Sequence, residues 1–133
     1  MVEWREDRAL KKDLISLIKG SKVSWVNISR VFAYRSLNAK TRAYARIWGL
    51  SRIWQEALKI SPAYIIEVIS EKYDKLSKHE KNKILLHELV HIPKNFSGAL
   101  IPHTRRRKGS FRDTLKKLYE DYNSARRQHP QKL

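Results

Sequence analysis

Residues 77–93 constrain the fold most, because the start, interior and end of this segment all indicate one helix. Ser77 and Glu80 have the spacing of a capping box, in which each side chain accepts a hydrogen bond from a backbone N–H group of the other residue. Apolar residues follow at helical spacing, and Pro93 cannot continue a helix. The sequence therefore predicts a helix over residues 77–92.

This predicted helix carries His87, Glu88 and His91 in the pattern HExxH. Residues four apart lie about 40° apart around a helix and about 6 Å apart along it, so both histidines project from one face. Two imidazoles placed in this way can bind one tetrahedral metal ion. Glu88 can then reach a metal-bound water and take its proton. The alternative is a partly buried helix whose histidines make ordinary hydrogen bonds.

A catalytic zinc ion usually has three protein ligands, so a third ligand must come from another part of the chain. The chain has no cysteine, which leaves nitrogen and oxygen ligands. His103 is the best candidate, because the prolines and glycine of residues 93–102 can turn the chain back toward the helix. We expect His79 on the surface and no role for His129. Carboxylate alternatives lie further along the chain: Asp113, Glu120 and Asp121.

The remaining segments predict an α+β fold. Helices are expected over residues 3–19, 51–59 and 110–122, and strands over residues 30–35, 42–48 and 63–70. Alanines in residues 40–48 leave a helix open as an alternative there. The length of 133 residues is typical of one domain, here residues 1–133 with a basic tail at about 126–133. All four tryptophans are expected in the core: Trp4, Trp25, Trp48 and Trp54.

The chain carries 29 basic and 13 acidic residues, which gives a formal net charge of +16. Such an excess attracts nucleic acid, acidic proteins or anionic surfaces. One basic run is the candidate nucleic-acid-binding segment, and a solvated surface is its alternative; an arginine of this run is also a candidate oxyanion donor. The run consists of Arg105, Arg106, Arg107 and Lys108.

The chain resembles the zincin-like HExxH zinc metallopeptidases of archaea and phages, and more distantly SprT-like proteases and minimal gluzincins. It lacks the cysteine zinc ribbon of many SprT-like proteins and an obvious downstream glutamate motif of the gluzincin kind. The resemblance implies a small twisted, mostly antiparallel sheet packed on an active-site helix and further helices. It also implies one zinc ion bound by His87, His91 and His103, with Glu88 as general base. The residues that carry the resemblance are 64–70, 76–77, 87–93, 96–98 and 102–103.

In zincins an extended substrate pairs with an edge strand above the metal. The strand predicted over residues 63–70 precedes the HExxH helix, so it is the candidate for this role. Its candidate substrate-binding residues are Glu67, Val68 and Ile69. A central core strand is the alternative, which the nearly continuous apolar run favours about equally.

We therefore expect a zinc metallopeptidase that acts on a protein or peptide. The alternative class is a basic nucleic-acid-binding protein, or a protease recruited to nucleic acid, with a structural or degenerate metal site. A cytoplasmic protein without a membrane partner is expected, because the N-terminal segment is charged and no apolar run is long enough to cross a bilayer. The sequence makes no prediction of the oligomeric state.

Overall fold

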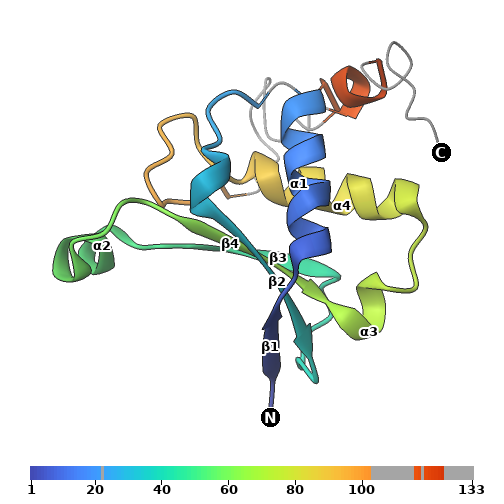
Figure 1. Cartoon of the computed structure of the whole chain (residues 1–133), viewed down its shortest axis with the longest axis horizontal. Coiled ribbons are helices and arrows are strands. Elements are labelled where there is room, and N and C mark those ends of the chain that lie inside the picture. The colour runs from blue at the N-terminus through green and yellow to red at the C-terminus, as the bar shows by residue number, and fades with distance from the viewer. Residues whose placement is uncertain (22, 103–115, 118, 125–133) are drawn as a thin grey trace.

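The computed structural model describes residues 1–21, 23–102, 116–117 and 119–124 (Figure 1). Residues 116–117 and 119–124 are helical. The preceding elements are β1 (Glu3–Glu6), α1 (Arg8–Gly20), the short 3₁₀ helix η1 (Ile28–Arg30), β2 (Val31–Leu37), β3 (Ala45–Gly49), α2 (Arg52–Leu58), β4 (Tyr64–Ile69), α3 (Ser70–Tyr73) and α4 (Lys78–Val90). This is the expected α+β fold. In the described part of the chain no helix has both the length and the apolar character needed to cross a membrane.

The strands of the described residues form one mixed sheet in the order β1-β2-β4-β3. β1 pairs with β2 and β3 pairs with β4 in antiparallel fashion, whereas β2 and β4 are parallel. Two of the three strand pairings are therefore antiparallel, in agreement with the expected mostly antiparallel sheet. β4 lies inside the sheet, and β3 forms one edge of it.

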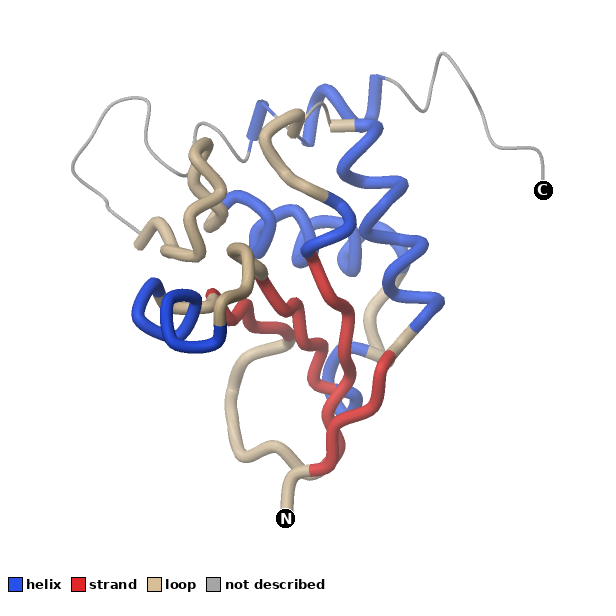
Figure 2. Tube along the Cα trace, turned by 60° about the vertical axis from the view of Figure 1, so that its left-hand side comes forward, coloured by secondary structure: helices blue, strands red, loops and turns tan. Residues whose placement is uncertain are grey.

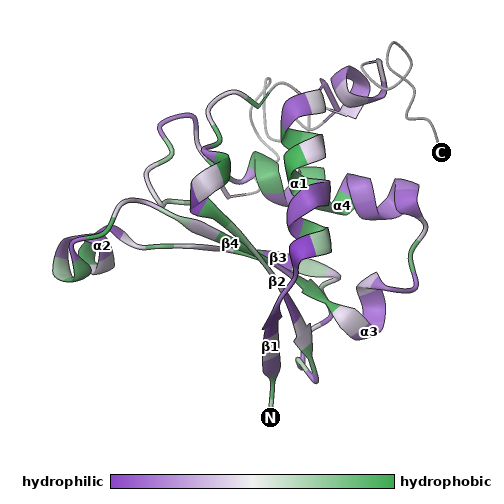
Figure 3. Ribbon diagram, in the orientation of Figure 1, coloured by the Kyte–Doolittle hydropathy of each residue, from purple (hydrophilic) through white to green (hydrophobic). Residues whose placement is uncertain are grey.

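Helices α1 and α4 cover one face of the sheet (Figure 1). α1 contacts β2, α4 contacts β3, and the two helices contact each other. In Figure 3 the first half of α4 is hydrophilic and its second half is hydrophobic, which is the half that packs on the core. Buried aliphatic side chains fill the space between helices and strands, among them Leu10, Leu14, Leu17, Val31, Ala33, Ile66, Val68, Leu85, Leu86 and Leu89.

The opposite face of the sheet exposes large apolar side chains. Phe32 and Trp48 both lie in register with Ile65 on the central strand. The exposed fractions of the three residues are 40%, 48% and 38%, respectively. Helix α2 stands apart from α1 and α4 at the end of the sheet (Figure 2), and none of its residues is buried.

Two expectations about the N-terminal half of the chain and its tryptophans are wrong. The helix expected from residue 3 begins only at Arg8, because residues 3–6 pair with β2 as β1. Asp7 then caps α1 by accepting a hydrogen bond from the Leu10 N–H. Three of the four tryptophans are exposed rather than in the core, namely Trp4, Trp48 and Trp54. The fourth, Trp25, is partly buried and donates its indole N–H to the Ile92 carbonyl.

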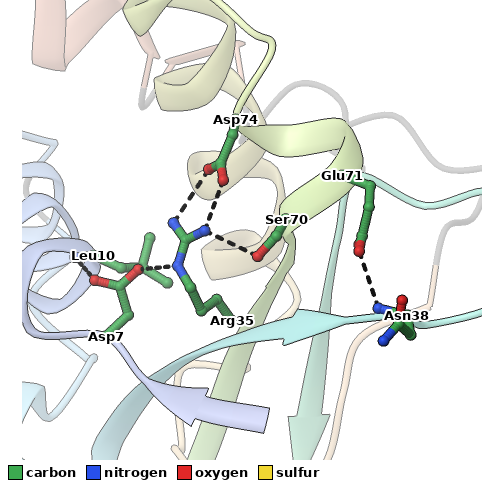
Figure 4. Close-up of polar contacts among 7 residues, drawn as sticks. All are labelled: Asp7, Leu10, Arg35, Asn38, Ser70, Glu71 and Asp74. Carbon is green, nitrogen blue, oxygen red and sulfur yellow. Dashed lines mark hydrogen bonds and ion pairs between the residues drawn. The ribbon is translucent and has the colours of Figure 1, made fainter. Parts of the chain in front are cut away.

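Arg35 on β2 ties the β1–α1 junction to α3 (Figure 4). Its guanidinium donates to the carboxylates of Asp7 and Asp74 at 2.8 Å each, and to the Ser70 hydroxyl at 2.9 Å. Burial alone would raise the pKa of Asp7, but the hydrogen bonds from Leu10 and Arg35 lower it overall. Because α3 leads directly into α4, this network fixes the approach to the helix that carries HExxH.

Candidate functional site

Helix α4 begins where the sequence predicts and ends two residues before the predicted end at residue 92. The Ser77 hydroxyl accepts from the Glu80 N–H at 3.2 Å, and the Glu80 carboxylate accepts from the Ser77 N–H at 3.2 Å. The capping box is therefore present. The helix ends at Val90, with His91 as its C-terminal cap. This register places the HExxH side chains on the last two turns of α4.

His87 and His91 lie close together on α4. Their ring centroids are 5.3 Å apart, with an angle of 72° between the ring planes. The Nδ1 atom of His91 lies 2.6 Å from the Ile101 carbonyl oxygen. When Nδ1 carries the proton it donates to this carbonyl, and the imidazole lone pair is then on Nε2. Metal-binding histidines typically have this arrangement, because a second hydrogen bond fixes their tautomer and orientation.

Glu88 lies beside this pair and is only 8% exposed. Burial disfavours its charged form and raises the pKa of the carboxyl group to about 7. A carboxylate of that basicity can accept a proton near neutral pH and return it in a later step. The arrangement at α4 therefore combines two nitrogen donors with one proton-transfer group.

Two adjoining cavities form a cleft between α4 and the edge strand β3. The first, which we call the lysine arm, has a volume of about 640 Å³ and is lined by Lys83, Ile84, Lys116 and Tyr119. The second, the loop arm, has a volume of about 550 Å³ and is lined by Ile47, His91 and residues 100–102. Both arms share four lining residues: Ala43, Ala45, His87 and Glu88. The HExxH residues thus lie at the centre of the cleft.

The loop of residues 93–102 returns to α4, as its prolines and glycine predict. The Ile101 N–H donates to the His91 carbonyl at 2.7 Å, at the C-terminal end of the helix. The Tyr64 hydroxyl donates to the Ala99 carbonyl at 2.7 Å and accepts from the Gly98 N–H at 2.8 Å. The loop is therefore held both by the helix that carries the motif and by the central strand.

Gly98 allows this loop to lie against the end of β3. Its φ angle of 93° is in the region that side chains other than glycine rarely adopt. A Cβ atom on Gly98 would lie 2.2 Å from the Leu50 carbonyl oxygen, and one on Gly49 would lie 2.1 Å from the Gly98 carbonyl oxygen. Glycine is therefore needed at both positions 49 and 98, because any side chain there would collide with the backbone of the other segment.

The edge of β3 offers backbone groups to the cleft. The Ile69 N–H donates to the Tyr44 carbonyl at 2.9 Å, and the Leu50 N–H donates to the Ala63 carbonyl at 3.0 Å. In an antiparallel pair, hydrogen-bonded positions alternate with positions whose groups point away. By this alternation the N–H and C=O groups of Ala45 and Ile47 point to the outer edge of β3.

The edge-strand role assigned to Glu67, Val68 and Ile69 is wrong. These residues belong to β4, which pairs with β2 on one side and with β3 on the other. All three are buried, and the Glu67 carboxylate accepts from Arg46 and Trp48 at 2.8 Å each. The central-strand alternative holds, because β4 has a paired strand on each side.

No group of three or more His, Asp or Glu residues that could hold a metal ion is found in the described ranges. Glu120 and Asp121 are described and are not grouped with the histidines. His79 is exposed, as expected, and contacts the Tyr119 hydroxyl. Several predicted residues lie outside the described part: His103, Asp113, His129, the run Arg105, Arg106, Arg107 and Lys108, and the tail of residues 126–133.

The donors present nevertheless fit a zinc ion. Two imidazoles one helical turn apart suit tetrahedral nitrogen coordination, and the Ile101 carbonyl orients one of them. In the sequence, His103 follows Ile101 by two residues. The third ligand predicted by the sequence is therefore attached to a segment that already contacts His91.

A family model described as "Putative phage metallopeptidase" matches residues 2–123. The chain belongs to this family, whose name indicates a metallopeptidase and therefore a metal ion. A search of curated proteins and a search of solved structures each found no match.

Proposed function

We propose that this chain is a zinc-dependent peptidase that hydrolyses peptide bonds, with one zinc ion held by His87, His91 and His103. The observation that carries the proposal is the position of HExxH at the centre of a cleft that β3 borders. Family membership supports the metallopeptidase class. A bound zinc ion would supply Lewis acidity and lower the pKa of a coordinated water.

Glu88 is the proton carrier of the proposed reaction. Its carboxylate accepts a proton from the attacking water, and the resulting carboxylic acid donates that proton to the departing amine nitrogen. One proton is taken and one is returned, so Glu88 ends each turnover ionised. The burial that raises its pKa to about 7 suits both steps near neutral pH.

An extended peptide would be oriented by the edge of β3. The N–H and C=O groups of Ala45 and Ile47 have the spacing of a strand, and a substrate backbone can pair with them as one additional strand. Ala45 lines both arms of the cleft. This pairing would hold the scissile bond opposite Glu88. It would not depend on the side chains of the substrate, because it involves only backbone groups.

The decisive experiment is metal analysis of protein purified without a chelating column. We expect about one zinc ion per chain, lost in His87→Ala, His91→Ala and His103→Ala. His79→Ala is the matched control, since this exposed histidine contacts Tyr119 and does not line the cleft. Glu88→Gln should keep the zinc ion and lose about 10³-fold in turnover of a peptide substrate.

Two results would contradict parts of the proposal. Unchanged zinc content in His103→Ala would show that the third ligand is another residue. Unchanged turnover in Glu88→Gln would show that Glu88 does not transfer the proton. A chain that binds no zinc in any form would overturn the proposed function as a whole.

A further inference from the structure

The lysine arm of the cleft is lined by two cations beside the HExxH motif. Lys83 and Lys116 line it, and Glu88 is the one acidic residue that does so within the described ranges. Of the described carboxylates, none forms an ion pair with either lysine. Glu80 lies three residues before Lys83, but its carboxylate accepts hydrogen bonds from Ser77. Within the described ranges, Lys83 and Lys116 thus have no ion-pair partner, and the Glu80 carboxylate interacts with Lys83 only at longer range.

Lys83 contacts one aromatic ring. Its ammonium nitrogen lies 5.4 Å from the ring centroid of Tyr119. The Tyr119 hydroxyl in turn contacts the imidazole of His79 at 2.9 Å or less. An ammonium group over an aromatic face keeps its charge and remains available to an anion on its other side. The arm is thus lined by one cation on α4 that contacts an aromatic ring, and by a second cation at Lys116.

The position of Lys83 sets the distance from the reacting bond. Lys83 is four residues before His87 on α4, which is about 6 Å along the helix. An extended peptide rises about 3.3 Å per residue, so this distance corresponds to one or two substrate residues. A substrate that pairs antiparallel with β3 runs from the loop arm to the lysine arm, since β3 itself runs from Ala45 to Gly49. The lysine arm then receives the residues that follow the scissile bond.

We propose that the lysine arm is a specificity subsite that binds a carboxylate of the substrate one or two residues after the scissile bond. The carboxylate can be an acidic side chain or the C-terminal carboxylate of a short peptide. This inference rests on the proposed function, because it names the substrate class of the same cleft. A positively charged wall favours such substrates by attraction and disfavours basic ones by repulsion.

The test uses the zinc-loaded full chain and one peptide sequence with Glu, Gln or Lys at each of the two positions after the cleaved bond. Each peptide is made with a free and with an amidated C-terminus, which separates the two sources of the carboxylate. We expect about a ten-fold higher kcat/KM for Glu than for Gln, and a smaller ratio at higher ionic strength. Equal kcat/KM values for all peptides would overturn the inference.

Charge-reversal variants connect this preference to the two lysines. Lys83→Glu and Lys116→Glu together should reverse the preference, so that the Lys peptide becomes the better substrate. Lys83→Arg should keep the preference for Glu. The controls use Lys75 and Lys59, exposed lysines that line neither arm: Lys75→Glu carries the charge change of one cleft substitution, and Lys75→Glu with Lys59→Glu carries that of the double variant. A preference that Lys75→Glu alters as much as the cleft variants do would overturn the inference.

A binding measurement separates this inference from the proposed function. Fluorescence anisotropy with the Glu88→Gln protein reports the affinity for the same peptides without turnover. Tighter binding of Glu peptides that the double lysine variant abolishes supports the subsite even if no peptide is cleaved. Cleavage without any acidic preference supports the peptidase and overturns the subsite. Thermal unfolding of each variant verifies that it is folded.

Discussion

The two faces of the sheet are made by the same strands and are stabilised in different ways. On the face under α1 and α4, Val31, Ile66 and Val68 are at most 1% exposed and belong to the hydrophobic core. On the other face, Phe32, Ile65 and Trp48 remain between 38% and 48% exposed. Successive residues of a strand point to opposite faces, so neighbouring residues in the sequence have very different environments.

The second face nevertheless contains fully buried residues, and one of them is charged. Glu67 lies between Ile65 and Ile69 on β4, on the side away from the helices, and it is 0% exposed. Arg46 and Trp48 cover its carboxylate and donate to it. The covered face is therefore held by aliphatic packing and the open face by a local polar network. The HExxH residues lie on the covered side of the sheet, where α4 packs against β3 and α1.

A pair of identical substitutions tests this comparison most strongly. Leu14→Ala removes a side chain that is 0% exposed between α1 and the sheet, and we expect a loss of about 3 kcal/mol in the free energy of unfolding. Leu58→Ala makes the same change on α2, where the side chain is 55% exposed, and should cost less than about 1 kcal/mol. Urea unfolding measures both. Equal losses would mean that Leu58 contributes as much to stability as a fully buried leucine despite its exposure.

The polar network of the open face should give the next largest effect. Glu67→Gln leaves the Arg46 guanidinium without its carboxylate partner, and we expect a loss of about 2 kcal/mol in the free energy of unfolding. Glu56→Gln is the matched control, because Glu56 pairs with Lys59 at 3.3 Å and both side chains are more than 75% exposed. This exposed pair should contribute less than about 1 kcal/mol. A Glu67→Gln protein as stable as the control would show that the network is dispensable.

The smallest expected effect is on the pH dependence of stability. Burial alone would raise the pKa of Glu67, but hydrogen bonds from Arg46 and Trp48 lower it below its usual value of 4.5. A lowered carboxyl pKa contributes stability above the unfolded-state pKa, and this contribution is lost as pH falls through the folded-state pKa. Acid unfolding followed by circular dichroism should therefore show a smaller drop below about pH 4.5 in Glu67→Gln than in the parent chain. An identical drop would assign the acid sensitivity to other groups, such as Asp7.

The sequence predicts the elements with strong local signals and fails where position depends on distant partners. The capping box at Ser77, the stop at Pro93 and the apolar run of β4 are local, and each is confirmed. β1 has only four residues and exists through its pairing with β2, so no periodicity reveals it. Trp54 is exposed because α2 lies beyond the end of the sheet. The position of α2 depends on the tertiary fold, so the local sequence does not predict this exposure.

The candidate site divides in the same way. Helical spacing alone brings His87 and His91 together, because both belong to one element. The edge strand, however, depends on the strand order, and the order in space differs from the order in sequence. The two lysines of the cleft come from segments more than 30 residues apart, so sequence reasoning named neither Lys83 nor Lys116 as a subsite. His103 stays a prediction, as does the nucleic-acid-binding role of the basic run.

The two hydrogen bonds of the Tyr64 hydroxyl have a mechanical consequence. They join Tyr64, the first residue of β4, to residues 98–99, in the loop that follows His91. Surface loops are usually more mobile than the elements they connect. The two hydrogen bonds to Tyr64 restrain this loop, because they attach it to a strand of the sheet. The conformational entropy of placing the Ile101 carbonyl beside His91 is then lost largely during folding, so that less of this cost remains to oppose binding of a metal ion by that imidazole.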